Sequence, residues 1–254
     1  MKTTHNTILI TGGGTGIGRA LAEAFHARGN QVIISGRTAK TLDETTAANP
    51  GMKSLVVDMT DAAGIRSFAA RLEQEFPSLN VLVNNAGIMR PENLLSPQDG
   101  LADAEAMIAT NLLGPIRLTA ALLPLLQKQP RATVMNVTSG LAFIPLAMTP
   151  TYSATKAALH SYTESLRYQL MDTSVEVIEL APPYVATYLM GEAQAADPVA
   201  MPLGEFISEV MEILTTQPGA DEVLVKRVQP LRFSSMGGPE KYDEIFQGLN
   251  SMVH

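Results

Sequence analysis

The chain has no cysteine and only a modest share of charged residues. The absence of cysteine among its 254 residues excludes disulfide bonds, thiolate metal sites and a cysteine nucleophile. Charged residues make up 17% of the sequence and the net charge is −7, whereas binding to nucleic acid requires a basic face. We therefore expect no nucleic-acid partner.

The sequence also lacks a long apolar run. Residues Met1 to Asn6 lead directly into a short apolar segment and do not form an apolar signal sequence. No uninterrupted apolar run is long enough to cross a bilayer. We therefore expect a soluble, cytoplasmic protein without a membrane partner.

Hydrophobic residues, by contrast, are numerous enough for a sizeable core. They make up 46% of the sequence, and α/β chains of this length often form a single domain, which we expect over residues 1–254. Short apolar segments alternate with helical patterns, which indicates βαβ units and a parallel sheet. Strands are predicted at residues 7–11, 31–35, 54–57, 132–137, 175–180 and 222–225, with a further strand from 81 that runs into a turn by 87. Helices are predicted at 19–28, 65–76, 104–126, 152–171 and 205–214.

A glycine-rich loop follows the first predicted strand. Gly12, Gly16 and Gly18 stand between that strand and a helical pattern, which is the setting of a dinucleotide-binding loop. Such glycines let the backbone approach a pyrophosphate, whose negative charge the helix N-terminus favours. The alternative is a tight strand–helix turn without a ligand. Three glycines in register directly after an N-terminal strand favour the dinucleotide.

The residue after the second predicted strand bears on which dinucleotide binds. An acid about 20 residues after the first glycine would bind a ribose 2′-hydroxyl, whereas an arginine suits a 2′-phosphate. The sequence has Arg37 in this region and no acid. A solvated loop arginine is the alternative interpretation. We predict a phosphorylated cofactor.

The segment from Ser139 to Lys156 holds side chains suited to proton transfer. Tyr152 and Lys156 are four residues apart, so in a helix both lie on one face. An ammonium group beside a phenol favours phenolate, which predicts a Tyr152 pKa below the reference value of about 10. Ser139 follows the strand 132–137 and therefore lies at a strand's carboxyl end, where open α/β sheets bind ligands. For the pair alone, a packed tyrosine and an exposed lysine are the alternative.

Two further segments have an open interpretation. Asn111 lies inside the predicted helix 104–126, where asparagine has modest propensity, so it is either structural or functional. Gly114-Pro115 predicts a bend in the same helix. Residues 187–202 lie in a proline-rich stretch and form either a substrate lid or an irregular surface connection.

No metal site is evident from the sequence. The histidines His5, His26, His160 and His254 lack metal-ligand spacing to one another or to a pair of carboxylates. His160 lies eight residues after Tyr152, on nearly the same helical face, where packing in the core or at an interface is expected. We therefore predict that no metal binds.

Together these motifs resemble the short-chain dehydrogenase/reductase family. The resemblance covers residues 7 to about 190 and rests on Thr11-Gly12-x-x-x-Gly16-x-Gly18, Asn84-Asn85-Ala86-Gly87, Asn111, Ser139, Tyr152-x-x-x-Lys156 and Pro182-x-x-x-x-Thr187. Within the family, the chain is similar to the subgroup named for an oxidoreductase encoded with the lipoteichoic-acid D-alanylation genes. The family usually has Pro-Gly where this chain has Pro182-Pro183, and the second proline stiffens the entry to the lid.

The resemblance implies an α/β fold of the Rossmann-type, doubly wound kind, with a seven-stranded parallel sheet flanked by helices. It implies hydride transfer between a nicotinamide and a carbonyl or alcohol carbon. Tyr152 would be the general acid in reduction, Lys156 would lower its pKa and hold the nicotinamide ribose, Ser139 would bind the substrate carbonyl, and Asn111 would hold a relay water. The family also implies a homodimer or homotetramer.

The resemblance further implies which residues bind the cofactor. Asp58 would meet the adenine, and Thr187 the nicotinamide carboxamide. Thr15 stands where many members that bind the phosphorylated cofactor carry a basic residue, so Arg37 is the residue that favours NADP(H) over NAD(H). The full cofactor set is Gly12, Gly14, Thr15, Gly16, Ile17, Gly18, Arg37, Asp58, Met59, Asn85, Ala86, Gly87, Tyr152, Lys156, Pro182, Val185 and Thr187.

We predict an NADPH-dependent carbonyl reductase that acts on hydrophobic aryl or alkyl ketones or aldehydes. The residues expected around the substrate are apolar, namely Met89, Leu141, Phe143, Leu146, Leu189 and Met190. No cation lies among them, although Arg90 is adjacent, whereas a sugar phosphate or keto acid would need one. The alternatives are an NAD-dependent alcohol dehydrogenase working oxidatively and a non-catalytic dinucleotide-binding regulatory protein. The latter has no need of a tuned tyrosine.

Overall fold

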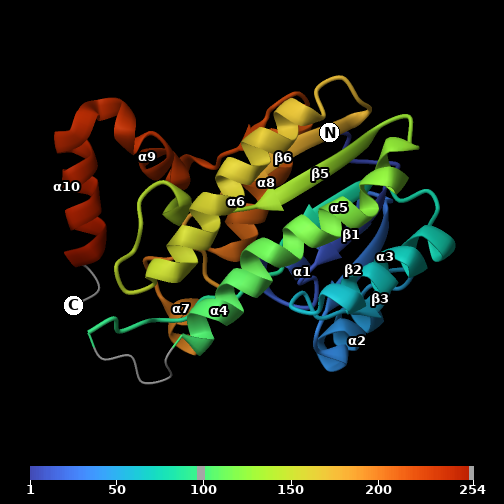
Figure 1. Ribbon diagram of the computed structural model, residues 1–254, viewed down its shortest axis with the longest axis horizontal. Helices are drawn as coiled ribbons and strands as arrows, with labels where there is room; N and C mark the ends of the chain where they lie inside the picture. The colour runs from blue at the N-terminus through green and yellow to red at the C-terminus, as the bar shows by residue number, and fades with distance from the viewer. Residues whose placement is uncertain (96–100, 252–254) are drawn as a thin grey trace.

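Seven parallel strands run through the centre of the molecule in the order β3-β2-β1-β4-β5-β6-β7 (Figure 1). The computed structural model describes residues 1–95 and 101–251. The strands are β1 (Thr7–Thr11), β2 (Gln31–Gly36), β3 (Lys53–Val56), β4 (Val81–Asn84), β5 (Ala132–Val137), β6 (Val175–Leu180) and β7 (Glu222–Val223). The strand order reverses between β1 and β4, so the predicted Rossmann-type doubly wound sheet is confirmed.

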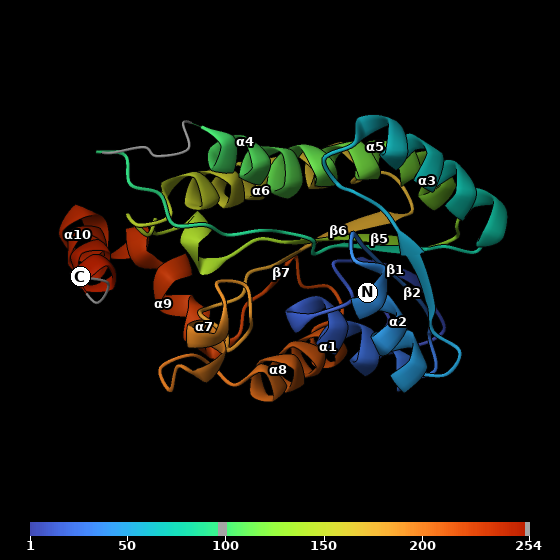
Figure 2. The ribbon, with the colours of Figure 1, turned by 90° about the horizontal axis from the view of Figure 1, so that it is seen from below.

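Helices cover both faces of the sheet (Figure 2). One face carries α1 (Gly16–His26), α2 (Ala39–Ala48) and α8 (Leu203–Thr216), and the other carries α3 (Ala62–Glu75), α4 (Ala102–Ile108), α5 (Gly114–Gln127) and α6 (Pro150–Gln169). Each face has its own apolar cluster, with Phe25 and Phe206 in the first and Leu122 and Leu166 in the second. Burial of one such side chain contributes roughly 1.5–3 kcal/mol, which makes the two clusters the main source of stability.

The strands are apolar because they are buried from both sides. Every residue of β1 and of β5 is buried, as expected of parallel strands between two helical layers. The strands predicted at 132–137 and 175–180 have the same bounds in the structure, whereas β3 begins one residue earlier than predicted and β7 is only two residues long. The hydrophobic pattern therefore located the centre of the sheet better than its edges.

The helix predicted over 104–126 contains an irregular turn. Residues Ala109–Leu113 form a π-helical turn between α4 and α5, in which the Gly114 N–H donates to the Ala109 carbonyl. The predicted bend at Gly114-Pro115 lies directly after this turn, at the start of α5. By length and composition the stretch Ala102–Gln127 could cross a membrane. It packs against α3, α6 and β5, as the core helix of a globular domain does.

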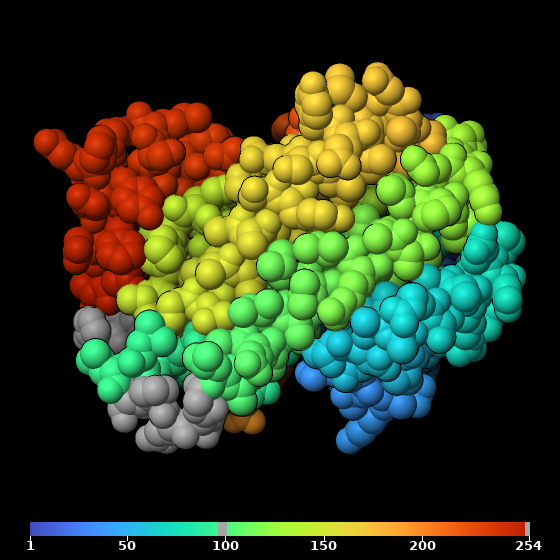
Figure 3. Space-filling model, in the orientation of Figure 1, coloured from blue at the N-terminus to red at the C-terminus, as the bar shows by residue number. Residues whose placement is uncertain are grey.

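After β7 the chain leaves the sheet. Two short helices, α9 (Gln229–Arg232) and α10 (Gly238–Ser251), follow the 3-10 turn Lys226–Val228 and flank the 3-10 turn Ser234–Gly237. Figures 1 and 3 show α10 in red at one end of the molecule, beside the segment that leads into α6. The Asn250 side chain accepts a hydrogen bond from the Ala147 N–H at 2.6 Å and donates to the Pro145 carbonyl at 3.2 Å. The C-terminal helix is thus held to the loop that precedes α6.

Candidate active site

A cavity of about 590 Å³ opens at the carboxyl edge of the sheet. It lies where the strand order reverses, between the loop after β1 and the turn after β4, and it is closed by the end of β5, by α6 and by residues 182–194. A crevice at this point is where open α/β sheets bind their ligands. The side chains and backbone groups around it therefore form the candidate active site.

The backbone of the glycine loop packs too closely to leave room for side chains at most of its glycines. Gly12 has φ +66°, and a Cβ on Gly18 would lie 2.3 Å from the Gly12 carbonyl oxygen. The helix α1 begins beneath the loop with no side-chain cap at Thr15 and no acid in its first turn. Its N–H groups and positive dipole end are consequently available to an anion, so this site fits the pyrophosphate of a dinucleotide.

Hydrogen bonds hold the glycine loop to the turn after β4. The Thr11 hydroxyl oxygen accepts from the N–H groups of Asn85 and Ala86, each at 3.0 Å. The Asn85 side chain donates in return to the Thr11 carbonyl at 2.9 Å. Asn85, Ala86 and Gly87 line the cavity, so the two walls of the cofactor cleft are fixed relative to each other.

The fold brings Ser139, Tyr152 and Lys156 together on one side of the cavity. Ser139 follows β5, and the other two residues lie one turn apart on α6, which begins two residues before Tyr152. All three side chains are buried. The Lys156 ammonium donates to the Val137 carbonyl at 2.8 Å and lies 5.6 Å from the centre of the Tyr152 ring. The arrangement offers a hydroxyl, a phenol and an ammonium group to one bound molecule.

The predicted lowering of the Tyr152 pKa is wrong for this site. Burial raises the pKa of Tyr152 to about 12, although hydrogen bonding to Ser139 acts in the opposite direction. Burial also lowers the pKa of Lys156 to about 8, against the negative charge of Glu179, which raises it. Desolvation therefore outweighs the charge pairing on which the prediction depended. At neutral pH the phenol is protonated, which is the form that donates a proton.

Asn111 lies behind the cavity wall and not in it. The π-helical turn directs its side chain at the backbone of Ile88, where Oδ1 accepts from the N–H at 2.9 Å and Nδ2 donates to the carbonyl at 2.8 Å. Nδ2 also lies 3.3 Å from the Thr155 hydroxyl oxygen. These contacts hold the turn after β4 against α6. The catalytic role of Asn111 stays a prediction.

Hydrogen bonds among residues 185–201 hold the segment that was predicted as a lid. Val185 and Met201 pair as a parallel bridge, and the Ala186 N–H donates to the Met201 carbonyl at 2.9 Å. A short helix, α7 (Glu192–Ala196), places the buried Gln194 so that its amide donates to the Val185 carbonyl at 2.8 Å and lies 3.2 Å from the Thr187 hydroxyl oxygen. Gln194 lines the cavity, and no spacing rule in the sequence points to a glutamine in this irregular stretch.

Comparisons with known proteins agree with this geometry. Residues 6–198 match the protein family described as short chain dehydrogenase. The chain belongs to this family. It is 40% identical over 254 residues to the uncharacterized oxidoreductase DltE of Bacillus subtilis (strain 168), and the match covers 99% of each chain. The predicted family and subgroup are confirmed, and the protein is an NAD(P)-dependent short-chain oxidoreductase.

Solved structures of the family share the fold over nearly the whole chain. A short chain dehydrogenase from Burkholderia cenocepacia J2315, in complex with NADP, is 25% identical with a TM-score of 0.83, covering 97% of this chain and 99% of that one. A second, from Burkholderia phymatum in complex with NAD, is 20% identical with a TM-score of 0.79 over 96% of each chain. Short-chain dehydrogenases of this fold thus bind either dinucleotide.

Four of the predicted cofactor residues do not line the cavity: Gly14, Arg37, Asp58 and Met59. Gly14 packs against Thr41, and Met59 is buried in the apolar cluster beneath α3 and α5. Arg37 and Asp58 are exposed after β2 and β3, at the end of the cleft where the family binds adenosine. Asp58 accepts hydrogen bonds from the Thr60 N–H and hydroxyl, both at 2.9 Å. The Thr60 N–H is the main reason that the pKa of Asp58 is lowered, and the Arg37 charge adds to it.

Only some of the residues predicted to bind the substrate line the cavity. Met89 and Leu189 line it, whereas Leu141, Phe143, Leu146 and Met190 do not. The Phe143 ring instead lies under Arg232, whose guanidinium carbon is 4.8 Å from the ring centre. The same ring meets His160 edge-on, with 5.0 Å between the two ring centres.

Ile88, which was expected beside Met89 near the substrate carbonyl, also lines the wall. Three residues that were not predicted to bind substrate line it as well, namely Arg90, Pro183 and Tyr188. Arg90 forms an ion pair with Asp103, so the cation beside the cavity already has a counter-charge. Pro183 stands where the family usually has glycine, and the carbonyl of the preceding Pro182 accepts from the Gly140 N–H at 2.8 Å.

The sequence also gave no sign of a polar cluster beneath α6. His160 meets the carboxylates of Glu179 and Glu222, whose ligand-type atoms all lie within 4.8 Å of one another. Sequence spacing could not show this, because the three residues lie on α6, β6 and β7 and meet only through the register of the sheet.

Proposed function

We propose that the protein is an NADPH-dependent carbonyl reductase of hydrophobic aryl or alkyl ketones and aldehydes. The observation that carries the proposal is the convergence of Ser139, Tyr152 and Lys156 on a cavity that begins at the glycine loop. A protonated, buried phenol is suited to give a proton to a carbonyl oxygen. We further propose that the enzyme works in the cytoplasm as a homodimer or homotetramer, as its family's members typically assemble.

The residues of the site divide the work of reduction. A dinucleotide held at the glycine loop and the start of α1 would supply the hydride for the carbonyl carbon. The Ser139 hydroxyl hydrogen-bonds the carbonyl oxygen and orients it, and the Tyr152 hydroxyl donates its proton to that oxygen as the alcohol forms. The Lys156 ammonium stabilises the phenolate left behind and holds the nicotinamide ribose. The roles of all three residues are those of the family, transferred to positions that the fold brings together.

We propose reduction as the working direction. Burial keeps the Tyr152 phenol protonated, which is the form that gives a proton to a carbonyl oxygen. A panel of ketones with NADPH and NADH, and of alcohols with NADP⁺ and NAD⁺, followed at the nicotinamide absorbance band, tests the proposal. Turnover of alcohols with NAD⁺ but of no ketone with NADPH would support the oxidative alternative. Turnover with no pair would support the non-catalytic one.

We predict that Arg37→Ala lowers kcat/KM for NADPH by about tenfold and leaves kcat/KM for NADH nearly unchanged. Arg37 is exposed at the end of β2, where its guanidinium can pair with a 2′-phosphate through charge-assisted hydrogen bonds, each worth roughly 1.5–3 kcal/mol. Steady-state kinetics with both cofactors measure the effect. Arg28→Ala, two residues after the end of α1, is the matched control. An equal loss with NADPH and NADH would mean that Arg37 is structural.

The apolar wall supports an uncharged substrate. Ile88, Met89 and Leu189 line the cavity, and Arg90, which also lines it, is paired with Asp103. A bulky ketone gains from burial against such a wall, and methionine adapts to several shapes, which suggests broad specificity. Activity is expected to rise from acetone to aryl ketones. A clear preference for anionic substrates would contradict the proposal.

We predict that Leu189→Ala shifts the preference among ketones toward larger ones. Leu189 lines the cavity, and replacement of its isobutyl side chain by methyl opens space that a bulkier substituent can fill. One methylene in an apolar pocket is worth about 1–3 kcal/mol, so changes of tenfold or more in relative kcat/KM are expected. Met190→Ala is the control, because Met190 is the next residue and does not line the cavity. The same shift in both variants would indicate a loosened lid and not a wall position.

A further inference from the structure

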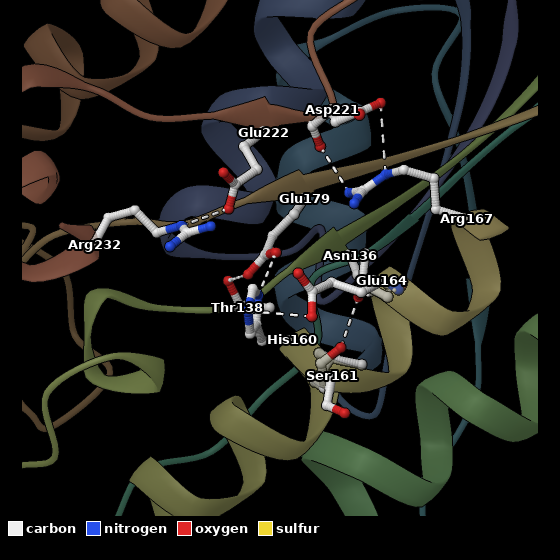
Figure 4. A network of polar contacts seen from close by, with 12 residues as sticks. Asn136, Thr138, His160, Ser161, Glu164, Arg167, Glu179, Asp221, Glu222 and Arg232 are labelled. Carbon is white, nitrogen blue, oxygen red and sulfur yellow. Dashed lines mark hydrogen bonds and ion pairs between the residues drawn. The ribbon is translucent and has the colours of Figure 1, made fainter. Parts of the chain in front are cut away.

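A carboxylate is completely buried beneath α6. Glu179, on β6, has 0% of its surface exposed. Figure 4 shows it between Thr138 and His160. The Thr138 hydroxyl donates to one carboxylate oxygen at 2.6 Å, and His160 Nδ1 lies 2.7 Å from the other. Both oxygens are partnered, as a buried carboxylate requires, and an apolar residue would fill the same space without that cost.

Charged side chains of both signs surround Glu179. From α6, Lys156, His160 and Glu164 face it, and Arg232 comes from α9 and Glu222 from β7. Arg232 is paired with Glu222 at 2.7 Å. The hydrogen bond to Glu179 raises the pKa of His160, and burial of the ring opposes this. The most deeply buried negative charge therefore lies between the catalytic helix and the sheet.

The geometry favours a charge network over a metal site. His160, Glu179 and Glu222 offer ligand-type atoms within 4.8 Å of one another. However, Glu179 is already bonded by Thr138 and His160, and the Arg232 guanidinium holds Glu222. A divalent cation would have to displace a guanidinium and break two short hydrogen bonds.

The network joins the catalytic residues at two points. Thr138 is the residue before Ser139, lines the cavity, and donates its N–H to the Leu180 carbonyl at 2.8 Å. His160 lies one helical turn after Lys156. Glu179 thus contacts the strand end that carries Ser139 and supports the positive charge of Lys156.

We propose that Glu179 is a positioning residue of the active site: its hydrogen bond to Thr138 fixes the end of β5 that carries Ser139, and its buried carboxylate places a negative charge beneath the helix that carries Lys156. The proposal rests on the proposed function, because it assigns Glu179 to the support of a catalytic Lys156. Glu179 does not touch substrate or cofactor. It acts through the ionisation of the lysine and the placement of the serine.

The test is the pH profile of Glu179→Gln. With acetophenone as the probe substrate and saturating NADPH, log kcat/KM is measured from pH 6 to pH 10. The neutral amide removes the charge that opposes desolvation of Lys156, so the alkaline limb is expected to move to lower pH by on the order of one unit. Glu176→Gln, which removes a half-exposed carboxylate from the same strand, should leave the profile unchanged. An unchanged limb in Glu179→Gln would overturn the proposal.

A second pair of variants tests the proposal while the buried Glu179 stays in place. His160→Arg places a guanidinium, which stays charged throughout this pH range, against Glu179. This cation cancels the effect of Glu179 on Lys156 and should also move the alkaline limb to lower pH. His160→Asn keeps a neutral donor near the carboxylate and should leave the limb in place. Identical profiles in these two variants would contradict the proposal even if Glu179→Gln fails to fold.

Failure of this inference differs from failure of the proposed function. Tyr152→Phe is measured in the same assay. If Tyr152→Phe retains turnover, the proposed catalytic centre is wrong, whatever the profile of Glu179→Gln. If Tyr152→Phe is inactive and Glu179→Gln keeps the wild-type profile, the centre stands and Glu179 does not support it.

Discussion

Replacement of Tyr152 by phenylalanine is expected to lower the rate of ketone reduction by about 10²–10⁴-fold, the usual contribution of general acid–base catalysis. The change removes the phenol hydroxyl, which is protonated at neutral pH and is hydrogen-bonded to Ser139. The ring stays in its buried position on α6, so the fold and the affinity for NADPH should change little. Single-turnover reduction of an aryl ketone and fluorescence titration with NADPH measure the two properties separately.

Tyr162→Phe is the matched control for this prediction. Tyr162 lies on the same helix, is also partly buried, and its pKa is likewise raised by burial, but it does not line the cavity. Its variant should keep wild-type turnover. Near-normal turnover in Tyr152→Phe would mean that another group donates the proton.

A methyl group on Gly18 is expected to have the largest effect on cofactor binding. In Gly18→Ala the new Cβ would lie 2.3 Å from the Gly12 carbonyl oxygen and 2.4 Å from the Asn85 amide nitrogen. The helix α1 must then move away from the glycine loop, and such overpacking costs about 1–3 kcal/mol. If the same free energy is lost from the complex, the affinity for NADPH falls by about 5- to 150-fold. Isothermal titration with NADPH and thermal unfolding measure both losses.

Gly204→Ala separates the local clash from a general effect of the substitution. Gly204 lies near the start of α8, with nothing within 4 Å of an added Cβ. Alanine there should leave NADPH affinity unchanged and raise stability slightly, because glycine costs roughly 0.5–1 kcal/mol within a helix. Unchanged affinity in Gly18→Ala would mean that the loop has more freedom than the distances indicate.

Much of the fold follows from local patterns in the sequence. The strands β5 and β6 are short apolar runs bounded by polar residues, and both have the predicted bounds. The helix α2 was not among the predicted elements, because Leu42 and Thr45 are its only buried residues and make a weak periodic signal. In α10, which the prediction also lacks, no residue is fully buried. Helices that bury few side chains have a weak hydrophobic periodicity in the sequence.

The site was predictable where a motif fixes its own geometry. The glycine loop, Ser139, Tyr152 and Lys156 lie together because each follows or begins an element at the same edge of the sheet. Residues that meet through tertiary structure were not predictable. The pKa of Tyr152 depends on burial, which outweighs a neighbouring charge. Glu179 of β6 reaches His160 only because α6 packs against that strand.

The residues of the cavity wall were only partly predictable from the sequence. Leu189 and Met190 are neighbours in a stretch without helical or strand periodicity, so nothing in the sequence shows which of them faces the cavity. The structure selects Leu189, because the Met190 N–H is bonded to the Gln194 side chain at 3.0 Å and Gln194 is held in turn by Val185.

The π-helical turn at Ala109–Leu113 adds one residue to a long helix without turning its two halves relative to each other. The bond from residue 114 to residue 109 spans five residues, one more than in an α-helix. Because the wider turn accommodates this extra residue over about the same rotation, α4 and α5 keep a common apolar face, with Met107 buried in α4 and Leu118 in α5. Deletion of one residue within this turn would restore regular α-helical bonds and leave the two halves in phase, but it would take the amide of Asn111 away from Ile88. The extra residue thus serves the turn after β4 and not the packing of the helix.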